Sequence, residues 1–130
     1  MMSKAILMVL LLVLSGNAAA QWVEVGSNGE QTVYADLTVV QREGNIVQMW
    51  DLFNFKSAQV MTLGKQYLSQ MSLHEYDCGA KRVRMLNFSQ HSDYMAEGAE
   101  MFRDVRSGAW QSLLPGSPIE LLWKIACRIK

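Results

Sequence analysis

The stretch IVQMWDLFNF, residues 46–55, carries the strongest strand signal in the chain. Successive side chains of a strand point to opposite faces of its sheet. Here both faces are largely apolar, with Val47, Met49, Phe53 and Phe55 on one and Ile46, Trp50 and Leu52 on the other. A strand with two apolar faces is covered on both sides. The stretch therefore predicts a central strand.

Turn signals on either side of this strand divide the neighbouring sequence into further short strands. The segment GSNG, residues 26–29, predicts a hairpin turn because Gly and Asn tolerate positive φ. Gly44 and Asn45 mark a second reversal, immediately before the central strand. We expect a loop over residues 56–65 and strands over residues 22–25, 32–37, 38–42, 46–55, 66–76 and 81–90.

Residues 92–106 fit either a helix or a strand. A helical spacing relates Met95, Ala99, Phe102 and Arg106. Gly98 argues against the helix, because glycine costs about 1 kcal/mol in a helix interior. We expect a strand here, for a reason that follows from a family resemblance given below.

The segment SPIELLWKIAC, residues 117–127, is the clearest helix in the sequence. Ser117 suits the N-cap and Pro118 the first helical position, and Glu120 completes a capping box. The apolar side chains share one arc of the helix, which also contains Cys127. We therefore expect this cysteine on the buried edge of the helix.

The first 20 residues have the pattern of a secretory signal peptide. A positive Lys4 is followed by an apolar run over residues 5–14, which is too short to cross a membrane, since that needs about 20 residues. Small residues up to Ala20 suit a cleavage site. We expect residues 1–20 to be removed, leaving one exported domain over residues 21–130 in the periplasm or at the outer cell surface, with no transmembrane segment.

Both cysteines, Cys78 and Cys127, lie within the expected mature domain. Export delivers them to an oxidising compartment, where two thiols in a small domain usually pair. A reactive Cys78 with His74 as its base is the alternative. On an extended strand these residues would lie about 13 Å apart along the chain, which disfavours that chemistry.

The charge balance of the mature domain gives no reason to expect nucleic acid as a partner. Without Lys4 it has eleven Lys and Arg against twelve Asp and Glu. A local cluster of Lys81, Arg82 and Arg84 is the candidate partner-binding site. Arginines on an edge strand also deter unwanted sheet pairing, so a purely protective role is the alternative.

No catalytic or metal-binding motif occurs in the chain. Paired ligands of the HExxH or CxxC type are absent from the sequence, as are GxSxG and a Gly-rich phosphate loop. We therefore expect no catalytic residue, cofactor or metal. The alternative is a small periplasmic enzyme or metal-handling protein that uses His74, His91 and nearby carboxylates, which are Glu75, Asp77 and Asp93.

Several motifs in fixed order resemble the bacterial surface-adhesin protein E family. They are the residues Trp22, Tyr34 and Asp36, the strand around Trp50, the EYDC segment at residues 75–78 followed by Arg82 and Arg84, Gly98, and the C-terminal set Trp110, Pro115, Gly116, Ser117, Glu120, Leu121 and Cys127.

This resemblance implies an α+β fold with one antiparallel sheet of about six strands. A C-terminal helix would pack on one face, tethered by a Cys78–Cys127 disulfide, and residues 96–105 would form a strand. It further implies a non-enzymatic protein-binding domain, an adhesin for host extracellular-matrix or serum proteins. A second copy of the chain is another candidate partner, through exposed sheet edges or the face that carries Trp50.

Overall fold

The structure is a computed structural model that describes residues 20–61 and 63–129. The expected signal peptide covers residues 1–20, and all of it except Ala20 lies outside the described residues. Among the described residues, no helix has the length and apolar character needed to cross a membrane.

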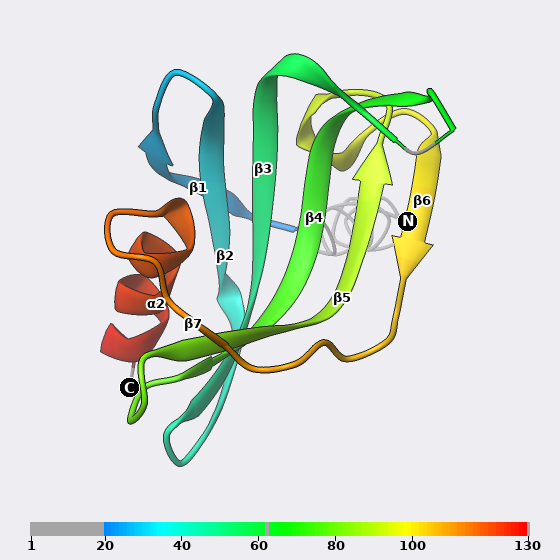
Figure 1. Ribbon diagram of the computed structural model, residues 1–130. Helices are drawn as coiled ribbons and strands as arrows, with labels where there is room; N and C mark the ends of the chain where they lie inside the picture. The colour runs from blue at the N-terminus through cyan, green and yellow to red at the C-terminus, as the bar shows by residue number, and fades with distance from the viewer. Residues whose placement is uncertain (1–19, 62, 130) are drawn as a thin grey trace, which may run out of the picture.

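A single antiparallel sheet forms the body of the domain, with its main strands side by side in chain order (Figure 1). A short seventh strand, β7 (Gln111–Ser112), pairs with the start of β5. The main strands are β1 (Trp22–Ser27), β2 (Gln31–Glu43), β3 (Ile46–Val60), β4 (Gln66–Asp77), β5 (Arg82–His91) and β6 (Glu100–Asp104). With the C-terminal helix described below, this confirms the expected α+β fold.

Strand β3 lies in the interior of the sheet, between β2 and β4, as its apolar faces predict. Val47 and Met49 face the C-terminal helix and are fully buried. Leu52, on the opposite face, is also fully buried. That second face carries the short 3₁₀ turn η2 (Tyr94–Ala96), whose Met95 N–H donates to Asn54 Oδ1 of β3 at 2.9 Å.

The expected loop over residues 56–65 is wrong in its first half, because β3 continues to Val60. Gln59 and Val60 pair with Tyr67 and Gln66 of β4 after a register shift that follows Asn54. The irregularity explains the error: an extended segment containing a bulge loses the two-residue alternation by which a strand is recognised.

The segment over residues 92–106 forms a strand only at β6, which is shorter than expected, and the helical alternative is wrong. Its first part is a tight turn in which Met95, Ala96 and Gly98 all have positive φ. Asp93 stabilises this turn, since its carboxylate accepts the Tyr94 N–H at 2.7 Å. Local side-chain hydrogen bonds of this kind compete with a continued strand.

Helix α2 (Pro118–Arg128) packs against β1, β2, β3 and β4, and Figure 1 shows it beside β1 and β2, far from the β6 edge. Its predicted cap is confirmed: Ser117 Oγ accepts the Glu120 N–H at 3.2 Å. Leu122 and Ala126 have no exposed surface. Burial of this apolar stripe, rather than propensity, is what stabilises a helix so short.

Candidate functional site

Two of the three predicted binding residues, Arg82 and Arg84, lie on the outer face of the sheet, which is the face opposite α2. They alternate along β5 with Val83, whose side chain belongs to the core under the helix. Trp110, which immediately precedes β7, covers both: its ring centre lies 4.6 Å from the guanidinium carbon of Arg82 and 4.8 Å from that of Arg84. We call these three residues the Arg–Trp cluster.

Two carboxylates of β4 hold the arginines in place. Asp77 and Glu75 are the direct cross-strand partners of Arg82 and Arg84. The Nε of Arg82 donates to Asp77 at 2.9 Å, and the Nε of Arg84 donates to Glu75 at 2.7 Å. The hydrogen bond from Arg82 lowers the pKa of Asp77. These pairs neutralise most of the positive charge of the predicted cluster.

Solvent still reaches the Arg–Trp cluster. The side chains of Arg82 and Arg84 are 45% and 33% exposed. An arginine whose plane is fixed by a carboxylate and an aromatic ring loses little further entropy when it binds. The cluster therefore presents oriented donors and an aromatic surface, the residue types that dominate the energy of protein interfaces.

Lys81, the third predicted binding residue, belongs to the turn between β4 and β5 and has a positive φ of 47°. Its Nζ lies 5.8 Å from the centre of the Trp123 ring of α2, so it is not part of the Arg–Trp cluster. Within the described ranges, no carboxylate pairs with Lys81 at ion-pair distance. It is therefore a cation with its charge uncompensated at short range.

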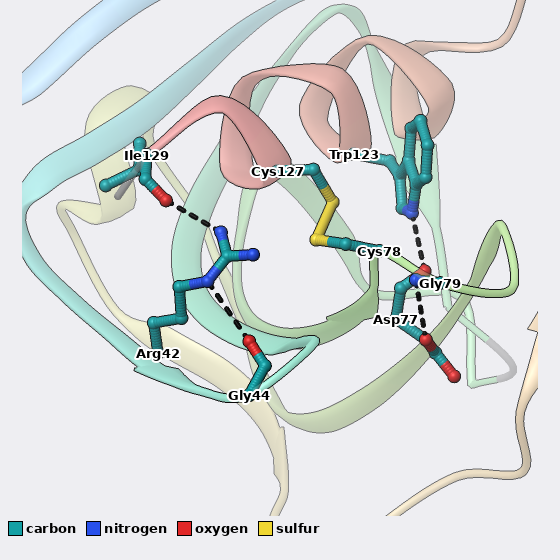
Figure 2. The surroundings of a disulfide bond; sticks show 8 residues. All are labelled: Arg42, Gly44, Asp77, Cys78, Gly79, Trp123, Cys127 and Ile129. Carbon is teal, nitrogen blue, oxygen red and sulfur yellow. Dashed lines mark hydrogen bonds between the residues drawn. A yellow bond between two sulfur atoms is a disulfide. The ribbon is translucent and has the colours of Figure 1, made fainter.

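The disulfide fixes this turn to the helix, as predicted (Figure 2). Cys78 and Cys127 are bonded, with their Cα atoms 5.5 Å apart. On one side of the disulfide, Trp123 Nε1 donates to the Asp77 carbonyl at 2.9 Å. On the other, Arg42 bridges the carbonyls of Ile129 and Gly44 (Figure 2). The disulfide and the Trp123 bond therefore hold the end of β4 against α2, and Arg42 ties the turn between β2 and β3 to the end of the helix.

The histidines and carboxylates of the enzyme or metal alternative do not converge. His74 points to the α2 side of the sheet. Ser69 is five positions before it on β4 and therefore points to the outer face. His91 is the cross-strand partner of Ser69, so it also lies on the outer face. Glu75 and Asp77 are occupied by arginines. In the part of the chain that the structure describes, no three His, Cys, Asp or Glu side chains form a metal-binding group.

A buried polar group that the sequence did not single out lies under His74. Asp51 of β3 is fully buried, and its Oδ2 is 2.5 Å from His74 Nδ1. Tyr76 donates to the same oxygen at 3.5 Å. Burial, reinforced by Asp51, raises the pKa of Tyr76 well above its usual value. In the sequence, Asp51 could have been recognised as the lone carboxylate on the otherwise apolar face of the central strand that carries Met49 and Phe53.

Trp110 is the other residue that sequence reasoning missed as a site residue. It stood out only as part of a C-terminal motif, 26 positions from Arg84 in the chain. The register of β7 on β5, Arg82 with Ser112 and Val83 with Gln111, brings it over the arginines. The acidic partners were more visible, since Glu75 and Asp77 alternate before the turn as Arg82 and Arg84 do after it.

Together these features define a small α+β domain, one antiparallel sheet with a disulfide-tethered C-terminal helix. Residues 22–128 match the sequence profile of the family described as surface-adhesin protein E. The chain belongs to this family, as the resemblance predicted.

Solved structures of Haemophilus influenzae protein E share the fold. One is 14% identical, with a TM-score of 0.60 over 86% of this chain and 87% of that one. Its selenomethionine form is 14% identical, with a TM-score of 0.61 over 87% and 90%. A second crystal form is 12% identical, with a TM-score of 0.58 over 85% and 97%. Comparison with curated protein sequences gives no match.

Proposed function

We propose that this protein is an exported, non-enzymatic adhesin domain that binds a protein partner, in the first place a host extracellular-matrix or serum protein. Membership of the surface-adhesin protein E family supports this assignment. The expected signal peptide over residues 1–20, and the disulfide, fit export to the periplasm or outer surface, with residues 21–130 as the working domain.

The observation that carries the proposal is the Arg–Trp cluster. Arg82 and Arg84 are oriented by carboxylates, stacked on Trp110 and open to solvent. A partner carboxylate can accept from the guanidinium N–H groups that face solvent, while an apolar side chain packs beside the indole ring. Lys81 adds a charge near by, so we expect the bound segment of the partner to be acidic.

The test is binding of purified residues 21–130 to an immobilised basement-membrane extract and to whole serum, measured by biolayer interferometry. We expect the double variant Arg82→Gln with Arg84→Gln to lose at least tenfold in affinity, and Trp110→Ala to lose a similar amount. The matched control is Arg103→Gln, because Arg103 is a 47% exposed arginine of β6 that is ion-paired with Glu100 rather than with a carboxylate of β4.

Equal binding by the double variant and the Arg103 control would reject the cluster as the binding site. Failure of the wild-type domain to bind either preparation would reject the adhesin assignment. Protease treatment of intact cells separates the two locations, because a surface protein is digested and a periplasmic one is sheltered. Light scattering tests whether a second copy is the partner, since a homodimer would double the measured mass.

A further inference from the structure

A cavity of about 580 Å³ opens on the α2 side of the sheet, and Arg84 of the Arg–Trp cluster is one of its lining residues. It lies between the start of α2, strands β3, β4 and β5, and the segment that leads to β7. Its size falls within the range of about 300–1,000 Å³ that is usual for small-molecule sites. Most of its lining surface is apolar, and the larger apolar side chains are Phe53, Phe55, Met85, Leu114 and Ile119.

Polar side chains also line the cavity: the Asp51–His74 pair, several glutamines and serines, and Arg84, whose guanidinium is paired with Glu75. Asp51 has no exposed surface, and its Oδ2 is bonded to His74 Nδ1. Its Oδ1 is the one buried side-chain nitrogen or oxygen, among residues 20–61 and 63–129, that lacks a hydrogen-bond partner. A buried carboxylate held with an oxygen unsatisfied is costly, which points to a role other than stability.

The second ring nitrogen of His74, Nε2, remains available. Among the described residues no atom hydrogen-bonds to Nε2, and Nε2 is not one of the fully buried atoms without a partner. It therefore keeps contact with open space, and the space that His74 lines is the cavity. Strand β5 is bulged beside this residue, where the register shifts between Leu73 and His74. Bulges of this kind re-aim side chains next to functional sites.

The bond to Asp51 decides what Nε2 can recognise. A carboxylate only accepts hydrogen bonds, so Nδ1 of His74 carries the proton and donates. In the neutral imidazole, Nε2 is then an acceptor. A ligand group that meets it must be a donor. An anionic ligand would be repelled by Asp51, while the guanidinium of Arg84 is already paired with Glu75. A cationic ligand would lose its hydration among apolar side chains.

We propose that this cavity binds a small uncharged molecule with an aromatic ring and one hydroxyl group. The hydroxyl donates to Nε2 of His74, and the ring packs against Phe53 and Phe55, which already form a tilted aromatic pair 6.3 Å apart. This site goes beyond the proposed adhesin function: the cavity opens on the other face of the sheet, and Arg84 is the residue that the two sites share.

The probe is 2-naphthol, followed in the wild-type domain at pH 7.5 by ¹⁵N NMR of the histidine rings and by titration calorimetry. We expect binding that shifts the Nε2 resonance of His74 and leaves His91 unchanged. The chain has only these two histidines, and His91 Nε2 is already bonded to Ser89 at 2.8 Å, so it is an internal control. Replacing the hydroxyl by a methoxy group should weaken binding about fivefold to tenfold.

Two variants complete the test. His74→Phe keeps an aromatic ring but removes the acceptor, and should lose the preference for the hydroxyl. Ala109→Trp adds bulk at an exposed position of the rim and should abolish binding without disturbing the core. No binding of 2-naphthol, equal affinity for its methyl ether, an unshifted His74, or tighter binding of 2-naphthoate or 2-naphthylmethylamine would each overturn the proposal.

Discussion

Removing the disulfide should cost this domain a large share of its stability. The perturbation is the double variant Cys78→Ala with Cys127→Ala, which leaves no unpaired thiol. The two cysteines are 49 positions apart, and closing a loop of that length lowers the entropy of the unfolded chain by an amount worth about 4 kcal/mol at 25 °C. Small domains have a net free energy of unfolding of only about 5–15 kcal/mol.

The assay is urea unfolding followed by tryptophan fluorescence, with and without a reductant. With an m-value of about 1–2 kcal/mol per molar urea, we expect the midpoint to fall by about 2–4 M. Reductant should lower the wild-type midpoint to that of the variant and leave the variant unchanged. A loss below 1 kcal/mol would refute the reasoning, because it would mean that the unfolded chain gains little freedom when the tether is cut.

Three further changes test other parts of the structure. Leu122→Ala removes a fully buried side chain of α2 and should cost about 2–5 kcal/mol in urea unfolding, whereas a loss under 1 kcal/mol would mean that the helix is not anchored there. Gly98→Ala should lower the melting temperature, because φ is +74° and an added Cβ would lie 2.4 Å from Ser92 Oγ; an unchanged melting temperature would contradict that turn. The hydrogen bond from Arg82 lowers the pKa of Asp77, so its contribution to stability is complete above the ordinary value of 3.8 and is lost as the pH falls through the lowered one. In urea unfolding from pH 5 to pH 2, Arg82→Gln should therefore flatten the acid limb of the stability curve, and parallel curves would contradict this pairing.

The sequence predicted the parts of the fold that rest on local periodicity. The central strand follows from the apolar alternation of residues 46–55, and α2 follows from its cap and its apolar arc. Irregular segments escaped the same reasoning. The bulge after Asn54 and the positive φ values of Met95 and Ala96 are local distortions, and the periodic spacing of apolar residues does not predict them.

The candidate site was predictable only in part, for a related reason. Lys81, Arg82 and Arg84 were visible as a charge cluster, but their charge balance depends on which residues face them across the sheet. Glu75 and Asp77 come from the neighbouring strand and Trp110 from a segment beyond β6. A shift of one residue in either register would turn these side chains to the wrong face.

By itself, the sequence determined the strand and helix that build the core and the direction of Cys127, because side-chain periodicity along one element fixes which residues share a face. Only the tertiary structure decided that Trp110 stacks on two paired arginines, and that Asp51 holds His74 beside a cavity. Those contacts join residues from different strands, and strand register, set by the whole sheet and its bulges, decides them.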